Sequence, residues 1–397
     1  MERRIIHLNI ANFCVAVEQV RDPRLRNRPV IIACPGPRAV VHDMSDEAYS
    51  EGVRKNMLLT AALRRCRSAL VLPPRPELYR KALGSCLKQA LQYTPLVERS
   101  SGNGHLYLDV TGTHRLFGPP PDIGWRLRNT LRRDLGLDPI WSIGTSKLIA
   151  KVASRLVKPR GEYIVGGGEE QSFLNPLPLQ LLPGISPADL LRLQHINIHL
   201  VHQVTALSVQ DLHVVCGRRA HRIYHLVRGI DPRPVHPVIS RKQDISHAYT
   251  FSPDTNQEAV VRAALTTLTQ RAGYDLRQRR LGCRRAAVML LYSDGVSVTR
   301  QAAVSLPVCD DTSLQQLVSA ALYRAWNRRI RLRQLTVTCS LLCHPAQQLS
   351  LFTAGDMRVQ KNRQLSKALD TIRSRCGDGT IFRGAQYPHI NTSIPLP

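Results

Sequence analysis

The architecture of this chain is predicted from one stretch near its start, Ile5-Ile6-His7-Leu8-Asn9-Ile10-Ala11-Asn12-Phe13-Cys14-Val15-Ala16-Val17-Glu18. Its first half is a short apolar run typical of a buried strand, and its second half has the spacing of a short apolar helix. A second stretch, His105-Leu106-Tyr107-Leu108-Asp109-Val110-Thr111-Gly112, has the pattern of another strand that ends in a turn.

Together, the two stretches resemble the palm of the Y-family (UmuC/DinB-like) DNA polymerases. In that family the first strand is roughly I-H-x-D-x-D-x-F-F-A-x-V-E, and the second is S-x-D-E-x-Y-L-D-x-T. The resemblance extends over nearly all 397 residues and is strongest over 1–161 and 348–384. It implies an α+β fold with a right-hand-like Y-family architecture: a palm, fingers, a helix-hairpin-helix thumb and a little finger.

The same resemblance implies a division of the chain into five parts. We expect the palm and fingers over 1–165 (fingers at about 35–75), a thumb over 166–232, a linker over 233–243, a little finger over 244–345, and a clamp-binding motif with a C-terminal tail over 346–397. The linker is rich in proline, which predicts an extended tether.

The charges of the family's active site are replaced in this chain. Phosphoryl transfer by a polymerase uses two divalent metals held by carboxylate oxygens. The resemblance places these carboxylates at Asn9, Gly104 and His105. An amide, a bare backbone and an imidazole do not supply the anionic cage that Mg²⁺ needs. We therefore predict no catalytic residue, no metal, no cofactor and a chain that is not an enzyme.

The triphosphate site of the family is also altered. Its tyrosine and arginine fall on Asp46 and Tyr49, so a carboxylate lies where a polyphosphate would bind and a bidentate arginine contact is lost. Lys158 matches a lysine that contacts the triphosphate in the family. Without metals, we expect Lys158 to serve the fold or a DNA phosphate.

One alternative is an active error-prone translesion polymerase of the UmuC or DinB type with a displaced Mg²⁺ site. Its candidate carboxylates are Asp43, Asp46, Glu47 and Asp109. Acidic residues at a helix N-terminus, however, usually complement the helix dipole, and Asp109 matches the end of the family's second strand.

The charge balance predicts a polyanionic partner. The chain carries 55 Lys and Arg against 29 Asp and Glu, a formal net charge of +26. Such an excess of positive charge favours nucleic acid as the first candidate for a binding partner and an anionic membrane surface as the second. No stretch approaches the roughly 18 apolar residues of a membrane helix, so we expect no membrane association.

Two segments are candidates for DNA contact. The turn Gly184, Ile185 and Ser186 resembles the family's thumb hairpin, which directs backbone N–H groups at a phosphate. Five arginines within nine positions also favour phosphate contact. They are Arg277, Arg279, Arg280, Arg284 and Arg285.

The sharpest short motif is Gln348-Leu349-Ser350-Leu351-Phe352. It matches the pentapeptide Q-L-[SD]-L-F with which bacterial proteins dock on the sliding clamp, where Leu and Phe fill an apolar pocket. The alternative is an amphipathic fragment that packs on its own domain.

The chain combines a palm that lacks the family's metal carboxylates with a clamp motif. In this combination it is similar to the ImuB-type mutasome proteins of the Y family. This likeness implies a non-catalytic adaptor in DNA repair, translesion synthesis and SOS mutagenesis. The implied partners are DNA, the bacterial sliding clamp, an error-prone C-family DNA polymerase and a RecA-like ImuA-type protein. We expect a cytoplasmic, nucleoid-associated location. A rival from another class is a general basic DNA-binding protein that never meets the clamp.

Overall fold

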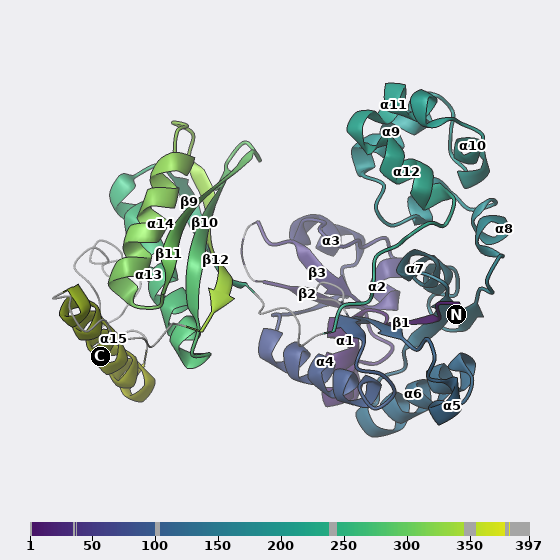
Figure 1. Cartoon of the computed structure of the whole chain (residues 1–397), viewed down its shortest axis with the longest axis horizontal. Helices are drawn as coiled ribbons and strands as arrows, with labels where there is room; N and C mark the ends of the chain where they lie inside the picture. The colour runs from purple at the N-terminus through teal and green to yellow at the C-terminus, as the bar shows by residue number, and fades with distance from the viewer. Residues whose placement is uncertain are drawn as a thin grey trace. The chain divides into compact units, whose positions relative to one another are not determined.

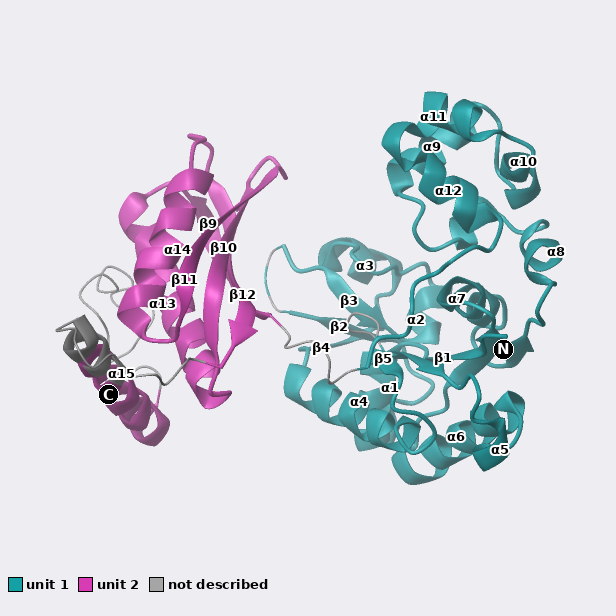
Figure 2. Cartoon of the chain, viewed as in Figure 1, with its two compact units in different colours: residues 1–240 teal, residues 241–397 magenta. Residues whose placement is uncertain are grey.

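The computed structural model of the chain describes residues 2–34, 36, 38–99, 104–237, 244–344, 355–377 and 381. The chain divides into two compact units, residues 1–240 and residues 241–397 (Figure 1, Figure 2). No helix in the described part of the chain has the length and apolar composition that a membrane crossing demands.

A five-stranded sheet forms the centre of the first unit. Its strands lie in the order β5 (Val97–Arg99), β6 (His105–Asp109), β1 (Ile5–Asn9), β7 (Ile140–Gly144) and β8 (Glu162–Ile164). β1 is antiparallel to both of its neighbours, and Asn9 lies opposite His105 in the pairing with β6. The two stretches that predicted the architecture are therefore adjacent strands.

Helices cover both faces of this sheet. On one face lie α1 (Phe13–Arg21), α4 (Pro76–Ala90) and α6 (Pro120–Leu135), with the short α5 (His114–Phe117) before α6. Leu8 packs in the core on this face. On the other face lies α7 (Lys147–Leu156), and Ile5 joins a small apolar cluster there. Because side chains alternate along a strand, His7 and Asn9 share the α7 face with Ile5.

A small three-stranded sheet follows β1 and α1 in the chain. Its strands are β2 (Val30–Ala33), β3 (Val41–Met44) and β4 (Leu70–Leu72), in the order β3-β2-β4, after the short η1 (Pro23–Leu25). Its helices are α2 (Asp46–Ser50) and α3 (Leu59–Arg65). The Ser45 hydroxyl caps α2 by accepting from the backbone N–H of Ala48.

The rest of the first unit is helical. It contains α8 (Glu170–Leu174), η2 (Leu179–Leu181), α9 (Pro187–His195), α10 (Val201–Thr205), α11 (Val209–Cys216), η3 (Gly217–Arg219) and α12 (Ala220–Val227). These helices share one apolar core with Ile149 and Val152 of α7. α7 therefore joins the central sheet to the helical part.

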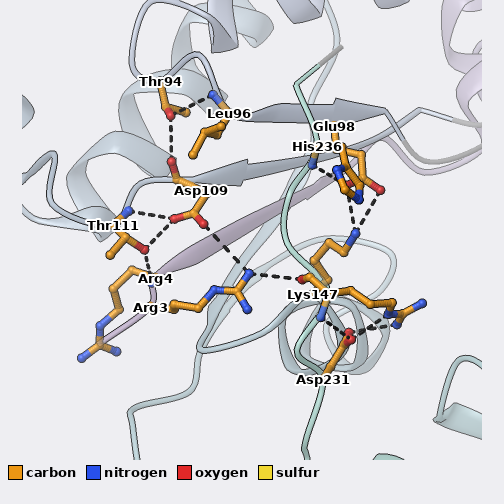
Figure 3. A network of polar contacts seen from close by, with 11 residues as sticks. Arg3, Arg4, Thr94, Leu96, Glu98, Asp109, Thr111, Lys147, Asp231 and His236 are labelled. Carbon is orange, nitrogen blue, oxygen red and sulfur yellow. Dashed lines mark hydrogen bonds and ion pairs between the residues drawn. The ribbon is translucent and has the colours of Figure 1, made fainter. Parts of the chain in front are cut away.

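The stretch after α12 runs along the first unit. Val235 is buried with Ile5 and Tyr107, and the backbone N–H of His236 donates to Glu98 at 2.8 Å (Figure 3). Residues 233–237 form no helix or strand, and residues 238–243 of the predicted linker lie outside the described residues.

The second unit is an antiparallel sheet with two helices. Its strands lie in the order β11 (Ser297–Val308), β10 (Gly282–Tyr292), β12 (Leu332–Cys343) and β9 (Ile245–Thr255). α13 (Glu258–Gln278) and α14 (Asp311–Ala325) share its apolar core, and α15 (Gly355–Cys376) follows. Both units combine helices with sheets, which confirms the α+β prediction.

Candidate functional site

Asn9 and His105 face one another at the end of the β1–β6 pair. Asn9 is 2% exposed, and its amide nitrogen has no hydrogen-bond partner among the described residues. The two positions that the resemblance assigned to metal carboxylates are therefore adjacent in space, but they carry a buried amide and an imidazole.

A chain of contacts links His105 to α7 through His7. Nδ1 of His105 lies 3.2 Å from Nε2 of His7, whose Nδ1 lies 2.8 Å from the Ser154 hydroxyl. The two imidazole rings stack with centroids 5.2 Å apart, and the Tyr107 ring lies 4.6 Å from His7. Burial, followed by nearby cations, lowers the pKa of His105 to about 3; burial also lowers that of His7 well below its usual value. Both imidazoles are therefore neutral at neutral pH.

Gly104 is fixed as glycine by its surroundings. Its φ of +73° is a backbone conformation that L side chains rarely adopt, and an added Cβ would lie 2.7 Å from Cβ of Phe13. Its carbonyl accepts from the backbone N–H of Ile10 at 3.0 Å. A carboxylate side chain at this position would force α1 or the backbone to move.

The carboxylates of Asp43 on β3 and Asp46 on α2 already have hydrogen-bond or ion-pair partners. Asp43 is buried, accepts from the backbone N–H of Cys14 at 2.9 Å and pairs with Lys55 at 2.8 Å. Asp46, predicted at the degenerate triphosphate site, accepts from the Asn12 side chain at 2.7 Å. Among the described residues, no three side chains of His, Cys, Asp or Glu are grouped as a metal ion requires.

Asp109 has a structural role at the end of β6. Its Oδ1 accepts from the backbone N–H and the hydroxyl of Thr111, and its Oδ2 lies 4.0 Å from Arg3 (Figure 3). Taken together, an amide, a glycine and a neutral imidazole at the metal positions do not fit a pair of Mg²⁺ ions, which require oxygen ligands with negative charge.

Three cations lie on α7 and just after it. Lys151 and Arg155 are one turn apart on the helix, and Lys158 lies two residues beyond its last residue, Leu156. Arg155 donates a hydrogen bond to the backbone carbonyl of Leu181. Burial lowers the pKa of all three, and neighbouring cations lower those of Lys151 and Lys158 further. Of these three cations only Lys158 was predicted as a site residue, although the spacing of the three is visible in the sequence.

The predicted hairpin turn precedes α9. Gly184 has a φ of +108°, Ile185 is buried, and Ser186 caps α9 by accepting from the backbone N–H of Asp189 at 3.2 Å. Asp189 is itself buried and pairs with Arg219 at 2.9 Å. The first turn of this helix therefore carries a negative charge, which weakens its attraction for a phosphate.

The five arginines of the second unit have different surroundings. Arg279, Arg280 and Arg284 are exposed, and Arg285 is half-buried. The side chain of Arg277 is 11% exposed and forms ion pairs with Asp311 at 2.7 Å and Asp370 at 2.6 Å. Arg277 therefore ties α15 to the helices of its unit, and the predicted phosphate contact has to come from its exposed neighbours.

Two other predicted sites can be placed only in part. Tyr49 is exposed, and the Arg54 guanidinium lies 3.9 Å from the centre of its ring. The predicted clamp motif, Gln348 to Phe352, lies outside the described residues.

Comparison with known proteins gives matches in both units. A model of the impB/mucB/samB family matches residues 8–155, and a model of that family's C-terminal domain matches residues 242–351. The chain is 32% identical to a DNA polymerase IV of Desulfatibacillum aliphaticivorans over 382 residues, 96% of each protein. It is 33% identical to a DNA polymerase IV of Halorhodospira halophila over 355 residues, 89% of this chain and 99% of that protein.

Solved structures of similar fold are Y-family polymerases. A chimera of the Y-family DNA polymerases Dbh and Dpo4 aligns with a TM-score of 0.74 and 18% identity, over 85% of this chain and 99% of that chain. DinB from Sulfolobus solfataricus aligns with a TM-score of 0.63 and 19% identity, over 86% of this chain and 100% of that chain. These likenesses confirm the predicted Y-family architecture.

The prediction that the chain is not an enzyme is wrong by this comparison. Its relatives match nearly its whole length and are named DNA polymerase IV, which is an enzyme. The residues at Asn9, Gly104 and His105 therefore do not by themselves show that activity has been lost.

Proposed function

This chain belongs to the Y family of DNA polymerases, and from that membership we propose that it binds primer–template DNA at sites of damage and takes part in translesion synthesis. The observation that carries the proposal is the row of three cations on α7 and just after it, Lys151, Arg155 and Lys158. Clustered cations provide phosphate contacts, and each contact releases counterions from DNA.

The second unit supports the proposal with its own cations. Arg279, Arg280 and Arg284 are exposed where α13 ends and β10 begins. With +26 overall, the chain is expected to bind DNA with a steep salt dependence.

We also propose that Gln348 to Phe352 docks the chain on the bacterial sliding clamp. The motif follows β12, the last strand of the second unit. The likeness to ImuB-type proteins extends the proposal to an error-prone C-family polymerase and a RecA-like partner, in the cytoplasm at the nucleoid.

DNA binding by the α7 row can be tested by fluorescence anisotropy of a labelled primer–template over a range of salt concentrations. We expect Arg155→Gln with Lys158→Gln to weaken binding about tenfold and to reduce the salt slope by roughly 2. The control is Lys88→Gln with Arg132→Gln, which removes two exposed cations from α4 and α6 on the opposite face of the sheet. Equal losses in the two variants would contradict a role for this row.

Primer extension on the same sample, with Mg²⁺ and separately with Mn²⁺, then tests whether this chain itself adds nucleotides. Nucleotide incorporation would show that this chain catalyses the transfer to the primer. DNA binding without incorporation would mean that the chain binds the primer–template and that another protein catalyses the transfer.

A further inference from the structure

A small polar cavity lies where α7, the turn before α9, α12 and the segment after α12 meet. Its volume is about 210 Å³, many times the roughly 10–15 Å³ that one ordered water requires. Four of its lining residues are cations and one is an acid. The lining residues are Glu98, Tyr107, Lys147, Leu148, Lys151, Pro183, Gly184, Arg222 and Arg233.

Two of the four cations already have carboxylate partners. Lys147 donates to both oxygens of Glu98, at 3.0 and 2.9 Å, and Glu98 also accepts from the backbone of His236. Arg233 donates to both oxygens of Asp231, at 2.6 and 2.9 Å. The first pair joins α7 to β5, and the backbone N–H of His236 ties the segment after α12 to the same carboxylate, whereas the second pair lies within that segment. The two pairs leave no carboxylate in the lining for the other two cations.

The other two cations, Lys151 and Arg222, come from different parts of the first unit. Lys151 projects from α7 and Arg222 from α12, and neither side chain has a hydrogen bond or ion pair with any described residue. Arg222 lies against Gly184, whose absent side chain leaves room for the guanidinium: an added Cβ would lie 3.0 Å from Nη2. Burial and three other cations lower the pKa of Lys151, as expected for an ammonium without a counter-ion.

We propose that this cavity binds a phosphate group between Lys151 and Arg222. The guanidinium fork of Arg222 matches two phosphate oxygens, and the ammonium of Lys151 supplies a point charge on the opposite side. Glu98 is satisfied by Lys147 and His236, so it repels the anion less than a free carboxylate would. The bound phosphate joins α7 to α12 and holds the hairpin turn at Gly184 in place.

The chemistry of the cavity excludes other classes of ligand. A divalent cation would meet four positive side chains and only one carboxylate, and that carboxylate already has partners. A nucleobase would find one aromatic ring, Tyr107, which already lies 4.6 Å from the ring of His7. Free inorganic phosphate and a DNA backbone phosphate share the chemistry that does fit.

The test is calorimetric titration of the full chain with inorganic phosphate at constant ionic strength. We expect saturable binding, and we expect Lys151→Gln and Arg222→Gln each to weaken it about 10- to 100-fold, the loss typical of one charged hydrogen bond. Matched controls are Lys88→Gln and Arg218→Gln, exposed cations on α4 and η3 outside the cavity. Lys151→Arg keeps the charge and should retain most of the affinity.

A second arm identifies the source of the phosphate. When the site is filled by the free ion, phosphate and primer–template bind together, and hydrogen exchange around Gly184 slows in phosphate alone. When the site is filled by DNA, phosphate competes with primer–template, and Lys151→Gln and Arg222→Gln lose DNA affinity where the two controls do not.

Two results would overturn the proposal: absence of saturable phosphate binding, or equal losses in the cavity variants and the controls. Because phosphate binding is measured without DNA, a failure of the proposed DNA binding would leave this result unaffected.

Discussion

At the scale of single residues, the palm face of this chain is built around Gly104, Asn9 and the His7–His105 pair. Each is explained by local contacts: a positive φ against Phe13, a buried amide opposite His105, and two imidazoles stacked under α7. From these contacts we predict effects of substitutions on the free energy of unfolding and, separately, on nucleotide incorporation.

Replacing Gly104 by alanine should destabilise the first unit by about 2–3 kcal/mol. Two costs add: the strain of a positive φ in alanine and the clash of its Cβ, 2.7 Å from Cβ of Phe13. The free energy of unfolding from urea denaturation measures this. Gly168→Ala is the control, since Gly168 has a φ of +85° but nothing within 4 Å of an added Cβ. The stability loss in Gly168→Ala therefore measures the cost of the strained backbone alone, about 1 kcal/mol. Equal losses in the two variants would show that the contact with Phe13 contributes nothing.

The His7–His105 pair makes the stability of the first unit depend on pH. The pKa of His105 is lowered from 6.5 to about 3 in the folded chain, so below pH 6.5 the unfolded chain binds more protons. Stability is therefore complete above pH 6.5 and falls as the pH drops towards 3, by at most about 1.4 kcal/mol per pH unit for each imidazole.

Urea denaturation between pH 4 and pH 7.5, with variants, measures this slope. His105→Gln should flatten it, whereas His213→Gln, an exposed thumb histidine, should not. The same slope in all three proteins would place the pH dependence elsewhere, for example in the buried carboxylates.

Placing two carboxylates on the β1–β6 pair tests what the palm face can hold. Asn9→Asp with His105→Glu puts two acids opposite one another in register, and carboxylate oxygens are the ligands that divalent metals prefer. We expect this double variant to incorporate nucleotide in Mn²⁺ at least roughly tenfold faster than the unmodified chain, equivalent to ~1.4 kcal/mol of barrier. Asn27→Asp with His114→Glu adds the same charges away from the strand pair. An unchanged rate in both metals, with the fold intact, would contradict the expectation.

At the scale of elements, the ion pairs of Arg277 decide how α15 is held. Its guanidinium donates to Asp370 of α15 at 2.6 and 2.8 Å, and to Asp311 at the start of α14 at 2.7 Å. The five arginines predicted a DNA contact here because a sequence shows where positive charge is concentrated. It does not show which carboxylates the fold brings to Arg277. Asp370 is 93 residues away in the chain, beyond the reach of any local pattern.

Arg277→Met should release α15, because two buried carboxylates lose their common partner. Removing one partner of a buried ion pair costs about 3–5 kcal/mol. Hydrogen exchange over residues 364–376 measures the release, and exposed Arg279→Met, at the C-cap of α13, is the control. Unchanged protection of α15 in Arg277→Met would mean that apolar contacts hold the helix by themselves.

At the scale of the whole molecule, the resemblance predicted the Y-family architecture because the two palm strands have strong local signals. The boundary between the two units falls at residue 240, and the division into five parts stays a prediction. The cavity between α7 and α12 could not be predicted. Lys151 and Arg222 are 71 positions apart, and only the packing of the thumb core on Ile149 and Val152 brings them together.

The proposed docking on the sliding clamp concerns the chain as a whole and is tested through its motif, Gln348 to Phe352. Leu351→Ala with Phe352→Ala should abolish binding to the bacterial sliding clamp, since the two side chains that fill the apolar pocket are its anchors. Surface plasmon resonance on immobilised clamp measures this, and primer–template affinity of the same variant should be unchanged. Leu306→Ala with Tyr323→Ala, which removes two exposed apolar side chains of the second unit, is the matched control. Clamp binding that survives the first change, or that is lost equally in both, would contradict docking through this motif. No clamp binding by the unmodified chain would favour the general basic DNA-binding protein.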